Sequence, residues 1–201
     1  MDIMDDFVYW GDWFTEKYRF QIGEGVRYPS MKMALNYFHQ KDGKVMVETG
    51  TTRAINDFGG AGMATIFLGE YCKRYGKKLY TVDILPQAIS LSKELTKDYA
   101  DVIEYVTADS LEFLKNFDEK IDLLYLDSYD YPIDEDPLKV RGSQGHQLKE
   151  LLAAWGKLSE NAVIILDDNA WKGGGKCKLT KQELVRRGKT CIWDDFQSVW
   201  I

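Results

Sequence analysis

An acidic residue closes or follows each of five apolar stretches that the sequence predicts as buried strands. These acids are Glu48, Asp83, Asp109, Asp127 and the adjacent pair Asp167 and Asp168. Because ligands of an open parallel sheet bind beyond the carboxyl ends of its strands, we expect the five positions to share one edge. A single acid there is typical of a helix N-cap, but five in succession predict a ligand site.

The residue types indicate the chemistry that each position suits. Gly50 lets the backbone pass close to a ligand, because it carries no side chain. The carboxylate of Asp83 can accept hydrogen bonds from a ribose diol, and that of Asp109 can accept from an amine. These two acids therefore predict a site for a ligand that contains a nucleoside.

The elements that would position these residues follow from the hydrophobic pattern. From residue 44 onward, apolar runs alternate with amphipathic stretches, which is typical of βα units in a parallel sheet. Several runs are almost continuously apolar, so we expect strands that are covered on both faces of a Rossmann-like, doubly wound α/β sheet. The expected strands are 45–48, 78–82, 102–106, 121–126 and 162–166, and the expected helices are 61–75, 86–98, 110–116 and 147–157. We expect Ser110 to be the N-cap of the helix at 110–116.

Three other segments differ from this pattern. Residues 190–194 and 197–201 predict a C-terminal antiparallel hairpin, which completes a mostly parallel sheet of seven strands. Residues 132–145 are expected to form a mobile loop after the fourth strand. Residues 1–43 carry a run of aromatic side chains and are interpreted as a helical segment ahead of a domain at 44–201. We expect this segment to be a lid or a dimer contact.

Over residues 44–200 the motifs resemble those of the class I S-adenosylmethionine-dependent methyltransferases. The resemblance implies that Glu48, Gly50 and Thr51 surround the methionine end of the cofactor, and that Asp83 with Ile84 holds the ribose. It further implies that Asp109 and Ser110 lie around the adenine, and that Asp127 in the segment 125–131 lies beside the transferable methyl. The implied activity is methyl transfer to a small molecule and not to nucleic acid, with oxygen as the expected acceptor atom.

The first loop departs from the usual pattern of that family. Gly59, Gly60 and Gly62 follow Gly50 only after an inserted segment, which we interpret as a lid or lip over the site. Arg53 in this segment is a candidate to meet the carboxylate of the cofactor. The glycines also resemble a dinucleotide-binding fingerprint, with Asp83 about twenty residues further on. An NAD(P)-dependent oxidoreductase is therefore the alternative enzyme, and a catalytically inactive S-adenosylmethionine-binding protein is the non-enzyme alternative.

The fourth and fifth strand ends also suggest a metal site. Asp127, Asp168 and Asn169 offer oxygen ligands that suit Mg²⁺ or Ca²⁺, and they resemble the metal ligands of the cation-dependent catechol- and caffeoyl-type O-methyltransferases. That family usually has a lysine as general base where this chain has Asp130. Asp130, Tyr129 or His146 are the alternatives for the base, with His146 expected in the first turn of a helix. The glycine-rich residues 172–178 are expected to form a flexible loop or to wrap an anionic substrate.

The composition of the chain excludes several other classes of protein. The chain has 201 residues and a net charge of −6, with no run of five basic residues, which argues against general binding to nucleic acid or to anionic membranes. Its three cysteines are widely spaced and form no zinc motif. The acidic N-terminus does not resemble a secretory signal. We therefore expect a cytoplasmic protein, and a homodimer is a further expectation from the aromatic segment.

Overall fold

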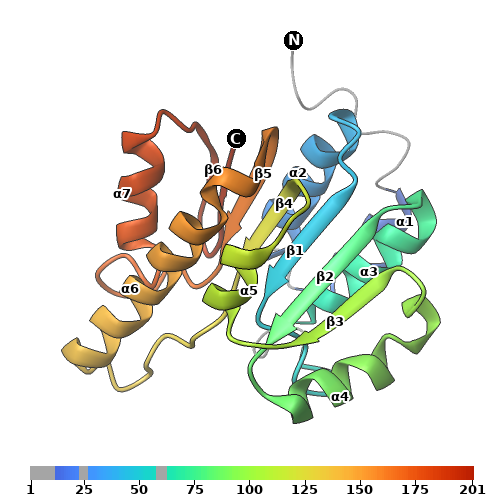
Figure 1. Cartoon of the computed structure of the whole chain (residues 1–201), viewed down its shortest axis with the longest axis horizontal. Coiled ribbons are helices and arrows are strands. Elements are labelled where there is room, and N and C mark those ends of the chain that lie inside the picture. The colour runs from blue at the N-terminus through green and yellow to red at the C-terminus, as the bar shows by residue number, and fades with distance from the viewer. Residues whose placement is uncertain (1–11, 23–26, 58–62) are drawn as a thin grey trace.

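The computed structural model describes residues 12–22, 27–57 and 63–201. Seven strands form one sheet with the order β3-β2-β1-β4-β5-β7-β6, in which the first five are parallel and β7 and β6 are antiparallel (Figure 1). The strands are β1 (Val45–Thr49), β2 (Lys78–Asp83), β3 (Ile103–Thr107), β4 (Ile121–Leu126), β5 (Leu158–Leu166), β6 (Cys191–Asp194) and β7 (Ser198–Trp200). The predicted mostly parallel sheet with a C-terminal hairpin is confirmed.

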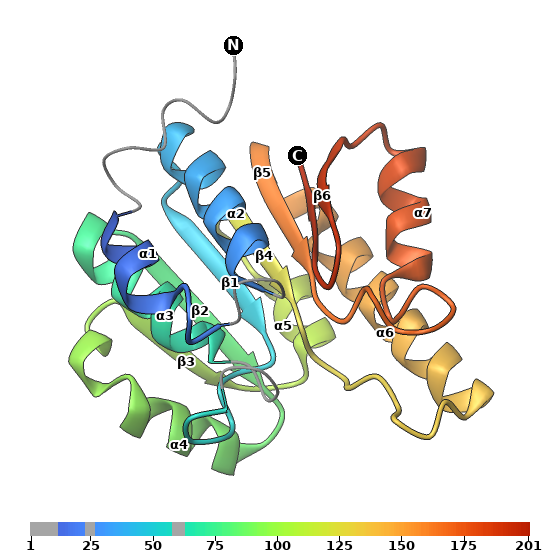
Figure 2. The ribbon, with the colours of Figure 1, turned by 180° about the vertical axis from the view of Figure 1, so that it is seen from behind.

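Helices cover both faces of this sheet (Figures 1 and 2). Helices α1, α2 and α3 lie on one face, and α5, α6 and α7 lie on the other. The helices are α1 (Asp12–Tyr18), α2 (Tyr28–Gln40), α3 (Ala64–Tyr75), α4 (Pro86–Leu95), α5 (Ser110–Asn116), α6 (Pro137–Ala154) and α7 (Lys178–Arg186). Two short 3₁₀ helices span Lys97–Tyr99 and Trp155–Lys157.

Residues 123–126 of β4 are all apolar because alternate residues enter different cores. In β4, Leu123 and Tyr125 join the core beneath α2 and α3, whereas Leu124 and Leu126 join the core beneath α5 and α6. Successive side chains of a strand point to opposite faces, so a strand that is covered twice needs apolar residues at every position. This arrangement is the reason that the sequence of β4 shows no polar alternation.

The structure corrects the prediction for residues 132–145. Helix α6 begins at Pro137, ten residues earlier than the predicted helix at 147–157, so most of the expected loop is helical. The carboxylate of Asp136 caps its first turn by accepting from the backbone N–H groups of Leu138 and Lys139 at 2.8 and 3.2 Å. Pro137 suits that first turn because its ring fixes φ and its missing N–H is not needed there. Helix α7 lies in a segment where no helix was predicted.

The described part of the N-terminal segment packs into the sheet core. Phe14 and Tyr18 of α1 are buried, and both rings contact the ring of Phe67 on α3 at centroid distances of 5.8 Å. Trp13 donates a hydrogen bond to the hydroxyl of Tyr75 at 3.0 Å. The lid and dimer-contact interpretations of residues 1–43 stay predictions. Among the described residues, no helix is long and apolar enough to cross a membrane.

Strand β1 buries a carboxylate among hydroxyl groups. Glu48 is 1% exposed, and its Oε2 accepts from Thr65 at 2.8 Å and from Thr81 at 2.6 Å. Burial raises the pKa of Glu48 to about 8, although the two hydroxyl groups favour the ionised form. The side chain is therefore largely protonated at neutral pH.

Replacing Phe14 by alanine tests whether α1 is part of the folded core. The ring is 0% exposed, so Phe14→Ala should lower the free energy of unfolding by about 3 kcal/mol, as for other buried aromatic side chains. Phe20, which is 79% exposed, provides the matched control, and Phe20→Ala should change the value by less than about 0.5 kcal/mol. Equal, small effects in urea denaturation would show instead that α1 detaches without disturbing the core.

Replacing Glu48 by glutamine tests the buried acid. A carboxyl whose pKa is raised in the folded state favours folding below its unfolded pKa of about 4.5, and this advantage is lost as the pH rises to about 8. Relative to the wild type, Glu48→Gln should therefore gain stability with rising pH, on the order of 2–3 kcal/mol near neutrality. Urea denaturation at several pH values measures the difference. Glu104→Gln, at an exposed position of β3, is the control, and a pH-independent difference for Glu48→Gln would contradict the prediction.

Candidate functional site

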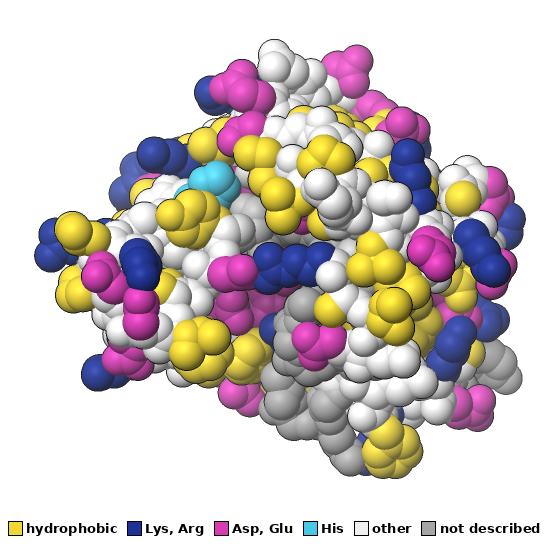
Figure 3. Space-filling model, turned by 90° about the horizontal axis from the view of Figure 1, so that it is seen from below, with side chains coloured by type: hydrophobic (Ala, Val, Ile, Leu, Met, Phe, Trp, Pro, Cys, Tyr) yellow, Lys and Arg dark blue, Asp and Glu magenta, His cyan; other side chains and the backbone are white. Residues whose placement is uncertain are grey.

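A cleft of about 410 Å³ opens at the carboxyl edge of the parallel strands. Figure 3 looks onto this edge and shows a hollow with acidic and basic side chains at its floor and apolar side chains around it. Most of the sequence-predicted site residues line the cleft. These are Gly50, Thr51, Asp83, Ile84, Asp109, Ser110, Asp127, Asp130, His146 and Asp168. The two others lie elsewhere: Glu48 is buried beneath the first turn, and Asn169 points toward the C-terminal hairpin.

The turn after β1 requires a glycine. Gly50 has a φ of +83°, and its N–H donates to the carbonyl oxygen of Val82 at 2.8 Å. A Cβ atom at this position would lie 2.7 Å from the carbonyl oxygen of Asp127. The backbone conformation and the close approach to the end of β4 therefore both exclude a side chain.

Asp83 is held rigidly at the end of β2. Its Oδ1 accepts from the N–H of Leu85 at 2.8 Å, and its Oδ2 accepts from the N–H of Thr51 at 3.3 Å. Each carboxylate oxygen can accept a further hydrogen bond, so a ligand hydroxyl can still bind there. The next residue, Ile84, is largely exposed and gives the cleft an apolar wall.

Asp109, rather than the predicted Ser110, caps helix α5. Its Oδ1 accepts from the N–H groups of Leu111 and Glu112 at 2.9 and 3.1 Å. Ser110 is the first helical residue, and its hydroxyl lies 3.2 Å from Nε2 of His146. The prediction failed on this point because aspartate and serine are both good N-caps, and the choice depends on where the chain leaves β3.

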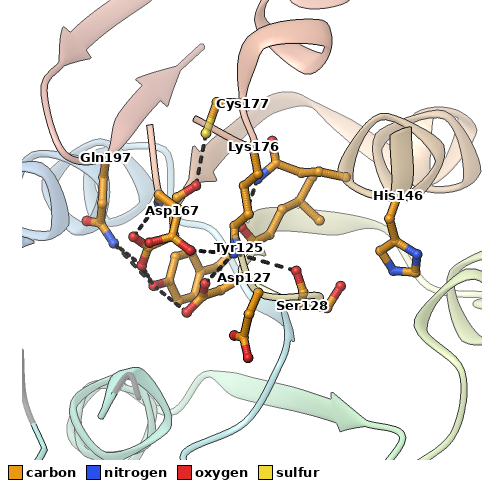
Figure 4. A network of polar contacts seen from close by, with 12 residues as sticks. Tyr125, Asp127, Ser128, His146, Asp167, Lys176, Cys177 and Gln197 are labelled. Carbon is orange, nitrogen blue, oxygen red and sulfur yellow. Dashed lines mark hydrogen bonds and ion pairs between the residues drawn. The ribbon is translucent and has the colours of Figure 1, made fainter. Parts of the chain in front are cut away.

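His146 lies in the middle of α6 and not in the first turn of a helix as predicted. Its ring stacks on Tyr129, with centroids 5.3 Å apart, and the carboxylate of Glu150, 3.6 Å from its Nε2, raises its pKa. Figure 4 shows it standing apart from Asp127 and Lys176. Because it contacts Ser110, His146 belongs to the side of the cleft that lies at the end of β3.

Arg53 and Asp130 form an ion pair at the mouth of the cleft. Both side chains are substantially exposed, so the pair contributes little to stability. The interaction joins the loop after β1 to the loop after β4. The ion pair joins two predicted candidates to each other: Arg53, predicted to meet a cofactor carboxylate, and Asp130, predicted as a general base.

A lysine ammonium lies where the sequence suggested a metal ion. Nζ of Lys176 is 2.7 Å from Oδ1 of Asp127 and 3.2 Å from Oδ2 of Asp168, and the lysine is 0% exposed (Figure 4). Asn169 is turned away from both, because its Nδ2 donates to Asp194 Oδ1 at 2.8 Å. The predicted ligand set therefore does not fit a divalent ion. Within the described part of the chain, no three or more acidic, histidine or cysteine side chains are arranged to hold a metal ion.

Lys176 lies in the glycine-rich segment 172–178, which was predicted to form a flexible loop or to wrap an anionic substrate. Gly173, Gly174 and Gly175 all have positive φ values, and a Cβ on Gly175 would lie 1.9 Å from the carbonyl oxygen of Asp168. These glycines let the turn fold tightly against the end of β5. The run of three glycines before Lys176 was the only signal in the sequence, and it does not reveal the direction of the side chain.

A second buried ion pair lies beside the first. Arg27, which precedes α2, donates from Nε to Oδ2 of Asp167 at 2.9 Å, and Gln197 donates to the same oxygen at 2.9 Å. The hydroxyl of Tyr125 also donates to Asp167. Sequence reasoning missed Arg27, because it lies 140 residues from its partner and outside the predicted domain.

These pairs determine the protonation of the buried acids. Burial would raise the pKa of Asp167, but Arg27 and Lys176 hold it below its usual value. Burial raises the pKa of Asp127, and Lys176 opposes that rise. Burial alone would lower the pKa of Lys176, but the neighbouring carboxylates raise it. Lys176 is therefore a permanent cation at neutral pH.

Comparisons with solved structures support the fold. The S-adenosylhomocysteine-bound methyltransferase PaMTH1 of Podospora anserina is 16% identical, with a TM-score of 0.55 over 85% of this chain and 76% of that one. The O-methyltransferase NovP is 12% identical, with a TM-score of 0.57 over 86% and 77%. A ribosomal protein L11 methylase of Lactobacillus delbrueckii subsp. bulgaricus is 11% identical, with a TM-score of 0.51 over 86% and 77%. At these identities the similarity shows the fold alone.

The family comparison is more specific. No curated protein matches the chain. A family model described as a methyltransferase domain matches residues 58–169, which is more than half of the chain. The match includes the ends of β2, β3, β4 and β5. The chain therefore belongs to this methyltransferase-domain family, and it shares the fold of the S-adenosylhomocysteine-bound methyltransferase PaMTH1.

Proposed function

We propose that this enzyme transfers the methyl group of S-adenosylmethionine to an oxygen atom of a small molecule. The observation that carries the proposal is that residues suited to bind a nucleoside and a carboxylate suited to accept a proton line the same cleft. Gly50, Asp83 and Asp109 supply a surface suited to a nucleoside, and the carboxylate of Asp127 lies at the same cleft. A site of this kind can hold a cofactor beside a group that accepts a proton.

The cofactor residues follow the order of the strands. Asp83 is suited to bind the ribose hydroxyls, since its oxygens retain free lone pairs. Asp109 and Ser110 are suited to surround the adenine, and Ile84 offers an apolar face against it. The turn at Gly50 and Thr51 leaves room for the methionine end. When bound, S-adenosylmethionine supplies an electrophilic methyl group on a sulfonium sulfur. After the methyl group is transferred, S-adenosylhomocysteine is the leaving product.

The acceptor end is built from the residues that follow β4 and β5. Asp127 is the group we assign to remove the proton of the acceptor hydroxyl, because its raised pKa suits a general base. Trp171 donates to Oδ1 of Asp168 at 3.1 Å and stacks on Tyr131 with an angle of 9° between the rings. This pair braces Asp168 from outside the cleft, whereas Tyr129 lines the cleft with a largely exposed ring, which favours a flat, small acceptor.

The other candidates for the base have different surroundings. Asp130 is occupied by Arg53, and His146 contacts Ser110 at the proposed adenine end. We therefore assign Asp130 to closing the mouth of the cleft and His146 to supporting the cofactor. No step in this mechanism uses a metal ion, since Lys176 fills the position between Asp127 and Asp168.

Two aspartates with the same capping geometry allow a controlled test of the cofactor site. Asp109 caps α5 and Asp136 caps α6, each through two backbone N–H groups. Asp109→Ala should weaken S-adenosylhomocysteine binding by about tenfold or more, because a charged hydrogen-bond acceptor is lost. Asp136→Ala should leave the affinity unchanged, while both variants lose about 1 kcal/mol of stability. Isothermal titration calorimetry measures the affinities, and equal affinities in both variants would contradict the assignment.

A panel of acceptors tests the reaction. The enzyme with S-adenosylmethionine should form O-methylated products from some phenols or alcohols, with loss of product in Asp127→Asn by roughly 10²-fold or more. Mass spectrometry of the products identifies the methylated atom. Products methylated only at nitrogen, or only on protein, would exclude the proposed acceptor class. Calorimetry with NAD is the parallel control for the dinucleotide alternative, and tight NAD binding without binding of S-adenosylhomocysteine would exclude the proposed cofactor.

A further inference from the structure

Lys176 is a buried cation that the proposed cofactor site does not use. Its side chain is 0% exposed, yet its ammonium reaches the ends of two neighbouring strands, β4 and β5. Removing a charge from water costs several kcal/mol even in real proteins, so a buried ammonium persists only with good partners. The partners here are oxygen atoms, namely Oδ1 of Asp127, Oδ2 of Asp168 and, at 3.5 Å, the carbonyl oxygen of Ser128.

The chain fixes this ammonium from several sides. The backbone N–H of Lys176 donates to the carbonyl oxygen of Asp168 at 3.2 Å. Gln144 of α6 donates to the carbonyl oxygen of Gly175 at 2.8 Å, and Sγ of Cys177 donates to the carbonyl oxygen of Asp167 at 2.9 Å. The lysine is therefore held by its own backbone and by both neighbouring residues.

The charges around Lys176 leave no place for a divalent metal ion between Asp127 and Asp168. Three carboxylates, those of Asp127, Asp167 and Asp168, face two permanent cations, Lys176 and Arg27. A divalent ion bound to Asp127 and Asp168 would lie against the ammonium, because both carboxylates already direct an oxygen toward Nζ. Mg²⁺ also needs oxygen ligands at about 2.1 Å in octahedral geometry, and Asn169 points elsewhere.

We propose that Lys176 is the resident cation of the acceptor site and takes the position that a divalent ion would otherwise occupy. It acts as a positioning residue: it holds Asp127 in place so that the other oxygen of that carboxylate can receive the acceptor proton. The role of Asp127 rests on the proposed function, whereas the replacement of a metal ion rests on geometry alone.

This arrangement has a consequence for the acceptor. A divalent ion binds two adjacent oxygens of a chelating acceptor such as a catechol, because it has open coordination positions. The ammonium of Lys176 lies behind the carboxylates and is shielded from the cleft. The acceptor therefore needs only one hydroxyl, and a vicinal diol gives no advantage over a single phenol or alcohol of similar shape.

Removing the ammonium tests the proposal with two readouts, the binding of a metal ion and the rate of methyl transfer. In the wild type, electron paramagnetic resonance should show no protein-bound Mn²⁺, and EDTA should leave methyl transfer unchanged. In Lys176→Ala, Asp127 and Asp168 lose their cation, so Mn²⁺ binding should appear while S-adenosylhomocysteine still binds. Methyl transfer should fall by roughly 10²-fold, and added methylammonium should restore part of it. Lys172→Ala, which changes an exposed lysine of the same turn, should match the wild type throughout.

A second variant covers the case in which Lys176→Ala does not fold. The double variant Lys176→Met with Asp168→Asn removes one charge of each sign, so the net charge of the cluster is kept. It should fold and bind S-adenosylhomocysteine but lose methyl transfer. The proposal is overturned if EDTA abolishes wild-type activity, if the wild type binds Mn²⁺ and Asp168→Asn removes that binding, or if the lysine variants transfer methyl at the wild-type rate.

The two proposals fail in different ways. If the wild type binds S-adenosylhomocysteine but methylates no hydroxyl compound, the proposed acceptor chemistry fails. The Mn²⁺ measurement still decides whether Lys176 occupies a cation position, because it needs no turnover. Equal rates on matched catechol and monophenol substrates support the acceptor class, and activity on catechols alone contradicts it.

Discussion

The balance of buried charge at the ends of β4 and β5 is the constraint on which the rest of the site depends. Asp127, Asp167 and Asp168 place three carboxylates there, and Arg27 and Lys176 bring the compensating cations. Breaking a buried ion pair by removing one partner typically costs 3–5 kcal/mol. The helix that follows Arg27 and the turn that carries Lys176 must therefore both dock before these strand ends are stable, so the site and the fold form together.

Much of the fold could be predicted from the sequence because its main signals are local. The strands are covered on both faces, so β4 and β5 are apolar at successive positions, and the acids that follow them mark the carboxyl edge. The first ten residues of α6 were missed because Gly142 and Gly145 weaken local helix propensity. Tertiary contacts compensate, because Ser143, Gln144 and Gln147 of this helix are buried in the folded protein.

The candidate site was predictable in its anions but not in its cations. An ammonium group and a divalent ion require the same oxygen ligands, so Asp127 and Asp168 alone cannot distinguish between them. Lys176 lies 49 residues from Asp127 in the sequence, and its burial depends on glycines with positive φ that pack against β5. The metal prediction was therefore wrong for a physical reason: the residue types describe the ligands and leave the identity of the cation open.

The two ends of the cleft are stabilised by different means. Beneath Gly50, hydroxyl groups surround Glu48, which burial keeps largely protonated, so that end rests on nearly neutral hydrogen bonds. The acceptor end rests on ion pairs instead. In the proposed reaction the positive charge of the sulfonium disappears during transfer, so carboxylates that bind it strongly before transfer would slow the reaction. By pairing most of the negative charge beside Asp127, Arg27 and Lys176 limit this attraction while keeping a carboxylate available for the acceptor proton.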